Sequence, residues 1–223
     1  MIRTRRDHLR QPPHPRMEPY LTDAGLWFAA QIPKFEYDNA LISAFVERWR
    51  PETHTFHLPY GECTITLQDV TFQLGLRVHS LPVSGCTGSW PRYYGGRDIW
   101  TICYDLLGAV PGQDARDGYS VDIKWFESTF RDLSADAPTE TVIRHTRAYI
   151  MQLLGGFLMA DKSGSRVHMR WLSRLDDFQH FGSHSWGSVV LAVLYRNLCR
   201  AVNSNVTDML GVWPSYSHGL LLD

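Results

Sequence analysis

Apolar residues recur at helical spacing along most of the chain, and the pattern is clearest in two long segments. In "PTETVIRHTRAYIMQLLGGFLMAD" (138–161) they return every three or four residues over about five turns. "SWGSVVLAVLYRNLCRAV" (185–202) repeats the pattern behind Ser185, a residue type that caps helices. Both segments therefore predict long helices that bury one face.

Three shorter segments show the same spacing and begin near a side chain that can cap a helix. Asp38 or Asn39 caps the first, and Asp98 caps the second. The second ends at Gly108, where the left-handed conformation that closes many helices is available. The three segments are "DNALISAFVERWRP" (38–51), "DIWTICYDLLG" (98–108) and "YSVDIKWFESTFRDL" (119–133).

Glycine and turn residues interrupt the helical pattern in two places. Gly155 and Gly156 fall inside the first long segment, where each costs about 1 kcal/mol against alanine, so we expect a kink or a close helix crossing. Beyond them, "DKSGSRVHMRW" (161–171) indicates a turn followed by another helix that reaches Phe178.

A period of two replaces the helical spacing near residues 54–66. "THTFHL" and "CTIT" alternate polar and apolar side chains, and "PYGE" between them is typical of a turn, which predicts a short β-hairpin. Thr66 then caps a helix, with Asp69 three residues later as in a capping box, and Gly75 ends it. The whole pattern predicts a mainly α protein: a single helical domain with one short β-hairpin near residues 54–66.

Composition supports a packed globular domain. The 223 residues are 44% hydrophobic and 20% charged, and the formal net charge of −1 gives no global attraction to nucleic acid or anionic membranes. The longest apolar run, "VVLAVLY" (189–195), is too short to span a bilayer. The first 19 residues carry five arginines and four prolines and no apolar core of a signal peptide, so we expect a mobile tail at 1–19.

The four cysteines are scattered, which argues against a structural zinc site and for a reducing intracellular compartment. Cys103 falls on the apolar face of its predicted helix and is interpreted as an inert core thiol. The cysteines are Cys63, Cys86, Cys103 and Cys199.

Histidine, cysteine, arginine and acidic side chains are most concentrated between Arg48 and Leu76. On a strand, His54 and His57 would point to opposite faces, so they cannot hold one metal ion together. His57 and Cys63 can meet across the hairpin as base and nucleophile, with Glu62 beside them; this is the only credible catalytic group. Hydrogen bonding within strand and turn explains the same residues more simply.

Other catalytic templates are absent from the sequence. It contains no G-x-G-x-x-G, no Walker A motif and no G-x-S-x-G elbow. A pyridoxal enzyme needs a Schiff-base lysine, and only Lys162 lies in a suitable loop, where we interpret it as a solvated turn partner of Asp161. We therefore expect no catalytic residue, no metal and no cofactor.

Several long segments together resemble the plant mobile domain family, the MAINTENANCE OF MERISTEMS-like or "aminotransferase-like" plant mobile domain proteins. The resemblance runs from about Tyr20 to about Val206 and rests on "ALISAFVERWRPETHTFHLPYGECTITLQDVTFQLGL", "PVSG", "RAYIMQLLGGFLMADKSGSRVHMRWL" and "SWGSVVLAVLYRNLCRA". It implies a nuclear protein of meristem maintenance and of transposon and gene silencing. It also implies partnership with a phosphatase 7 long-form homologue that carries a similar domain.

The resemblance divides the chain into a tail at 1–19, a plant mobile domain at 20–206 and an atypical C-terminal tail at 207–223. The last stretch, "NVTDMLGVWPSYSHGLLLD", departs from the family pattern and implies a C-terminally shortened copy, of the kind that transposon decay produces.

The leading hypothesis is a non-enzymatic module that binds protein partners in the nucleus. The alternative is a transposon-derived, nucleic-acid-associated protein that uses the arginine tail with Arg48 and Arg50, and an enzyme comes third. Trp, Tyr and Arg dominate interface energetics, and we expect the polar residues of the hairpin region to form local ion pairs or a polar surface. The candidate interaction or signature residues are Arg48, Trp49, Arg50, Glu52, His54, His57 and Glu62, with Tyr93, Tyr94 and Arg97 from the loop "GCTGSWPRYYGGR" (85–97).

Overall fold

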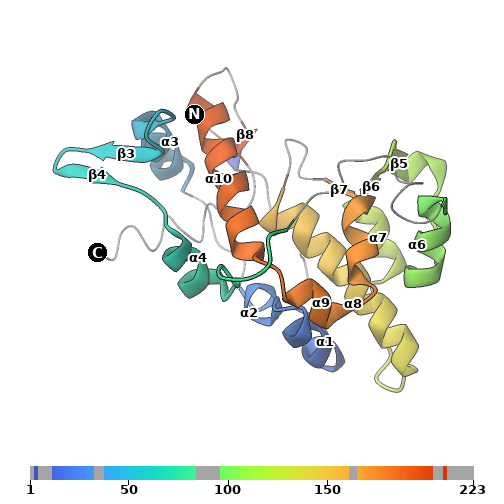
Figure 1. Cartoon of the computed structure of the whole chain (residues 1–223). Helices are drawn as coiled ribbons and strands as arrows, with labels where there is room; N and C mark the ends of the chain where they lie inside the picture. The colour runs from blue at the N-terminus through green and yellow to red at the C-terminus, as the bar shows by residue number, and fades with distance from the viewer. Residues whose placement is uncertain are drawn as a thin grey trace.

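The computed structural model describes residues 3–4, 12–32, 38–83, 96–160, 165–202 and 208–209. Helices dominate this part of the chain (Figure 1), so the predicted mainly α fold is confirmed. The helices are η1 (Pro15–Met17), α1 (Glu18–Asp23), α2 (Trp27–Ala30), α3 (Asn39–Arg48), α4 (Leu67–Leu74), α6 (Ile99–Leu107), η2 (Gln113–Ala115), α7 (Ile123–Thr129), α8 (Thr139–Leu153), η3 (Leu154–Leu158), η4 (Met169–Leu175), α9 (Phe178–Gly182) and α10 (Trp186–Val202). The strands are β1 (Arg3–Thr4), β2 (Trp49–Arg50), β3 (Thr55–Leu58), β4 (Gly61–Cys63), β5 (Arg116–Asp117), β6 (Ser120–Asp122), β7 (Arg166–His168) and β8 (Asp208–Met209).

Helix α8 is the centre of the larger packing unit, in contact with α1, η1, α6, α7 and η4. Its C-terminal half is buried on every side, including Ala148, Ile150, Met151 and Leu153. A helix that is apolar all round belongs inside a core. The predicted long helix at 138–161 is therefore confirmed as the main structural element.

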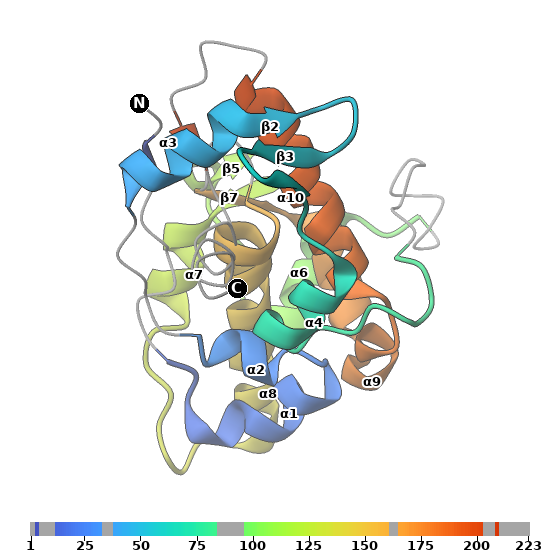
Figure 2. The same ribbon diagram turned by 90° about the vertical axis from the view of Figure 1, so that its left-hand side faces the viewer.

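Helix α10 forms the second axis of the fold and packs against α3, α4 and β2. Figure 2 shows it running past α4 toward the sheet that contains β2 and β3. Its inward face carries Val190, Leu194 and Leu198, at the helical spacing that the sequence predicts. The first sheet is thus held to the body of the protein by the last long helix.

The predicted hairpin is present as β3 and β4, and β2 adds a third antiparallel strand at its edge. The register places Trp49 opposite Phe56, and Phe56 opposite Cys63. The preceding helix was predicted to end at Pro51, but it ends at Arg48, because Trp49 takes an extended conformation and pairs with β3.

A second three-stranded antiparallel sheet, with strand order β5-β6-β7, was not predicted. The helix expected over 119–133 begins only at Ile123, because the residues before it form β6. Likewise the turn and helix expected over 161–171 include β7, which pairs with β6. Strands of two or three residues are too short for an alternating pattern to stand out from the neighbouring helical spacing.

Several local predictions are confirmed in detail. Thr66 and Asp69 form the capping box of α4, and Gly75 ends that helix in the left-handed conformation. Asp98 caps α6, and left-handed Gly108 ends it. The double glycine lies in η3, a π-helical turn that continues α8.

Ordered structure begins inside the segment expected to be a tail. Met17 is buried, and the Arg16 guanidinium donates hydrogen bonds to the backbone oxygens of Ala135 and Ala137, at 2.8 and 2.7 Å. The packed part of the protein therefore starts before residue 20, ahead of the boundary set by the family resemblance.

Candidate interaction surface

The hairpin is anchored by Trp49, whose side chain is completely buried. Its indole N–H donates to Sγ of Cys199 on α10 at 3.4 Å. Its ring lies 4.8 Å from the ring of Phe56 and 5.3 Å from that of Tyr195. Trp49 therefore supports the hairpin from within and presents no surface to a partner.

His54 lies in the turn that connects β2 and β3, with a φ of 55°, and not in a strand as predicted. Its ring stacks on Tyr195 with centroids 5.2 Å apart, and its backbone oxygen accepts a hydrogen bond from the Thr64 hydroxyl at 2.5 Å. The turn needs this left-handed residue because the chain must reverse tightly there. His54 is thus part of the packing between hairpin and α10.

His57 and Glu62 face each other across the hairpin. Nε2 of His57 lies 2.8 Å from Oε1 of Glu62, and the Thr55 hydroxyl donates to Oε2 of the same carboxylate at 2.9 Å. All three groups lie at the hairpin surface. The polar surface predicted for this region is present here, with a histidine as the partner of Glu62.

The hypothetical His57–Cys63 pair does not form. Cys63 lies opposite Phe56, one position along the strand from Glu62. Because successive side chains on a strand point to opposite faces, Cys63 and His57 lie on different sides of the sheet. Burial also raises the pKa of the Cys63 thiol, which makes it a poorer nucleophile.

The remaining candidate residues do not form one cluster. Arg48, Arg50 and Glu52 are exposed at the base of the hairpin, and Nη1 of Arg48 donates to the Ala44 oxygen of its own helix at 2.8 Å. Arg97 forms an ion pair with Asp105 of α6, at the other end of the molecule from the hairpin (Figure 1). Tyr93 and Tyr94 lie outside the described residues.

A surface that sequence reasoning missed lies beside α4. Phe72 is 92% exposed there, next to a groove of about 560 Å³. Phe28 of α2 is also exposed, and its Cβ approaches Gly75 so closely that an added Cβ on the glycine would lie 2.6 Å away. The groove is lined by Thr66, Leu67, Gln68, Thr71, Phe72, Val78 and His79.

A second groove, of about 620 Å³, continues from the first across their shared residue Val78 and follows α10. The Ser185 hydroxyl donates to the Val78 oxygen at 2.6 Å and so fixes this connecting segment against the start of α10. Ser185 lies directly before α10, where a capping residue was predicted, and its hydroxyl forms the hydrogen bond to Val78. We call the two grooves together the α4–α10 surface; the second is lined by Val78, Ser80, Pro82, Val83, Ser185, Ser188, Val189, Ala192, Val193 and Arg196.

The signal for Phe72 was present in the sequence. Val70 and Leu74 define the inward face of α4, and both are completely buried. Phe72 lies two residues from each of them, on the opposite side of the helix, and therefore points outward. An aromatic residue at an outward position is the observation that could have located this surface.

Neither a cluster of metal-ligating side chains nor a membrane-spanning helix occurs among the described residues. Within those residues, no three His, Cys, Asp or Glu side chains gather as a metal site would require. None of the helices described there combines the length and apolarity needed to cross a bilayer.

The fold and this surface define a class of protein: a mainly helical domain with two small sheets that presents aromatic side chains beside apolar grooves. Residues 25–214 match the family model described as plant mobile domain, and the chain belongs to that family.

Relatives of this chain occur in Arabidopsis thaliana. It is 46% identical over 191 residues to a protein named serine/threonine-protein phosphatase 7 long form homolog, a match that covers 86% of this chain and 14% of that protein. It is 37% identical to protein MAIN-LIKE 2, over 86% of this chain and 29% of the relative. It is 36% identical to protein MAINTENANCE OF MERISTEMS, over 80% of this chain and 36% of the relative. The chain thus spans only a minor part of these relatives, and no solved structure matches it.

Proposed function

We propose that this chain is a non-enzymatic interaction module that binds protein partners in the nucleus through the α4–α10 surface. The observation that carries the proposal is Phe72, almost fully exposed beside an apolar groove. Aromatic residues are enriched at the buried centre of protein interfaces, and a contiguous apolar patch rimmed by polar residues marks an interaction site where a single exposed apolar residue does not.

The names of the relatives support the biological setting of the proposal. One of them is named for the maintenance of meristems, and we extend that role, with transposon and gene silencing, to this chain. The phosphatase 7 long form homolog contains a segment 46% identical to this chain, and we propose it as the partner.

The test is an affinity pull-down from plant nuclei with mass spectrometry, comparing the full chain with Phe72→Ala and Tyr104→Ala. Tyr104 is a matched control because it is an exposed aromatic residue on α6, away from the α4–α10 surface. We expect the full chain and Tyr104→Ala to recover the phosphatase relative, and Phe72→Ala to lose it. Equal recovery by both variants, or recovery by none of the three chains, contradicts the proposal.

Nucleic-acid association is the second candidate, and exposed Arg48 and Arg50 at the base of the hairpin favour it. Contacts between arginine and phosphate weaken steeply as salt rises, because bound counterions are released. A gel shift at low salt with the chain and its Arg48→Gln/Arg50→Gln variant tests the idea. Absence of any shift at low salt rules it out.

A further inference from the structure

Helix α10 carries a second, largely apolar stripe besides the one that it buries. Its residues line the second groove of the α4–α10 surface, and they follow one another at i, i+3, i+4 and i+7. Residues at this spacing share one face of a helix. They remain partly or fully exposed, whereas the inward stripe is buried. The exposed stripe comprises Val189, Ala192, Val193 and Arg196.

The shape of this stripe suits a helix of a binding partner. Side chains at this spacing form the ridges between which the side chains of a neighbouring helix pack, and Ala192 adds little bulk in the middle of the stripe. From Ser185 to Arg196 the groove follows α10 for about three turns. A helix of similar length, with apolar residues at the same spacing, fits such a groove.

The charges around the stripe are of one sign. The described residues that line the two grooves include Arg196 and His79 but no carboxylate. Helix α10 contains two arginines and no aspartate or glutamate, although the whole chain has a formal net charge of −1. The carboxylate of Asp69 on α4 accepts hydrogen bonds from the backbone N–H and the hydroxyl of Thr66, at 2.6 and 2.7 Å, within the capping box. The surface therefore combines an apolar floor with a positive charge at exposed Arg196.

We propose that the α4–α10 surface binds an amphipathic helix of a protein partner, with an acidic side chain placed to meet Arg196. The inference rests on the function proposed above and adds the chemistry of the partner. The apolar face of that helix covers Val189 and Val193, and its carboxylate pairs with the guanidinium, whose planar set of donors matches a carboxylate. A basic helix would meet a like charge, which discriminates against it.

Photo-crosslinking from two positions identifies what covers the stripe. p-Benzoylphenylalanine replaces Ala192, or exposed His79 at the first groove, in the full chain. Each chain is irradiated in an extract of plant nuclei, and mass spectrometry sequences the attached segment. We expect a segment of another protein with apolar residues at helical spacing and acidic residues beside them. A segment without acidic residues, a second copy of this chain, a nucleotide, or no adduct from either position overturns the proposal.

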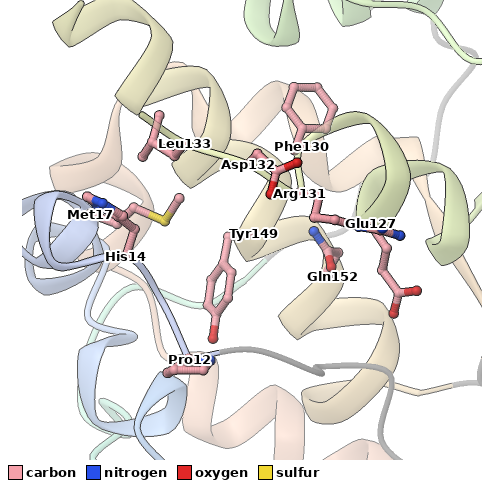
Figure 3. A pocket seen from close by; sticks show the side chains of 10 residues that line it. All are labelled: Pro12, His14, Met17, Glu127, Phe130, Arg131, Asp132, Leu133, Tyr149 and Gln152. Atoms are coloured by element: carbon pink, nitrogen blue, oxygen red, sulfur yellow. The ribbon is translucent and has the colours of Figure 1, made fainter. Parts of the chain in front are cut away.

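Charge reversal at Arg196 tests the ion pair directly. The probe is the phosphatase 7 long form homolog, titrated against the full chain and its variants. We expect Arg196→Glu to bind about fivefold more weakly, because attraction at the edge of the groove becomes repulsion. Arg131→Glu is the matched control, since exposed Arg131 lines a separate cavity where η1 approaches α7 and α8 (Figure 3).

The outcomes separate this inference from the function on which it rests. Circular dichroism spectra that match the unmodified chain show that each variant is folded. Equal affinity of folded Arg196→Glu and Arg131→Glu overturns the acidic helix and leaves the proposed function standing. Absence of binding by every chain, the unmodified one included, contradicts the proposed function itself.

Discussion

The indole N–H of Trp49 donates to Sγ of Cys199 across 150 positions of sequence, at 3.4 Å. The contact joins the strand at the base of the hairpin to the last long helix. The Trp49 side chain is completely buried, so Trp49→Ala leaves a large cavity at this junction. We expect the variant to lose about 3–5 kcal/mol of the free energy of unfolding.

Urea unfolding followed by circular dichroism measures this loss. The matched control is Tyr60→Ala at the tip of the hairpin, where the ring is fully exposed and its removal changes stability by about 0.5 kcal/mol or less. If Trp49→Ala is as stable as Tyr60→Ala, the hairpin is not anchored as the structure indicates.

Gly155 permits the closest approach between η3 and the second sheet. A Cβ added to Gly155 would lie 2.5 Å from the Cβ of Val167, a separation that real side chains do not tolerate. Val167 is buried and paired within β7, so it has little freedom to move away. We expect Gly155→Ala to destabilise the protein by about 1–3 kcal/mol, measured by urea unfolding.

A double-mutant cycle with Val167→Gly isolates the cause. Glycine at position 167 lacks the Cβ at 2.5 Å and the Cγ2 at 3.1 Å that the new methyl group would meet, so the two substitutions together should cost less than the sum of their separate effects. Contacting residues show couplings of about 0.5–3 kcal/mol, whereas additive losses would mean that Gly155 acts through backbone flexibility alone.

The elements that the sequence predicted well are those whose cause is local. The capping box of Thr66 and Asp69 and the left-handed end at Gly75 lie within ten residues of chain, and side-chain chemistry there decides the backbone. The second sheet could not be predicted in this way. Val121 pairs with Val167, a partner far along the chain, and neither strand exceeds three residues.

The same distinction between local and long-range causes applies to the candidate sites. The hairpin was predicted from its alternation, but the complete burial of Trp49 depends on Cys199 and Tyr195, which come from α10. The joining of the two grooves of the α4–α10 surface could not be predicted, because Ser185 contacts Val78 only after the long stretch of chain between them has folded.

His168 makes stability depend on pH. Burial first, and then the charge of Arg170, lowers the pKa of His168 from 6.5 to about 4. Between these values the unfolded chain binds the proton and the folded chain does not, so the free energy of unfolding rises with pH across this window. The contribution of His168 is fully present above pH 6.5 and is lost as pH falls to about 4.

Urea unfolding of His168→Asn between pH 4 and 6.5 tests this dependence. Nδ1 of His168 accepts a hydrogen bond from the Arg170 N–H at the start of η4, a role that an Asn side chain can take over. We expect a shallower rise in stability with pH than in the unmodified chain. His79→Asn, at an exposed position, is the control that should keep the original slope; equal slopes in all three chains would contradict the assignment.

The Cys103 thiol is predicted to be unreactive toward disulfide reagents in the folded protein. Its side chain is completely buried on α6, its thiol donates to the Ala109 oxygen at 3.3 Å, and burial raises its pKa to about 12. Because the thiolate is the reactive form, a disulfide reagent should not modify Cys103 until the chain unfolds. Titration with Ellman's reagent measures this: Cys103→Ser should leave the number of reactive thiols unchanged in buffer and lower it by one in denaturant. Loss of a reactive thiol from the folded variant would show that α6 opens readily enough to expose its inner face.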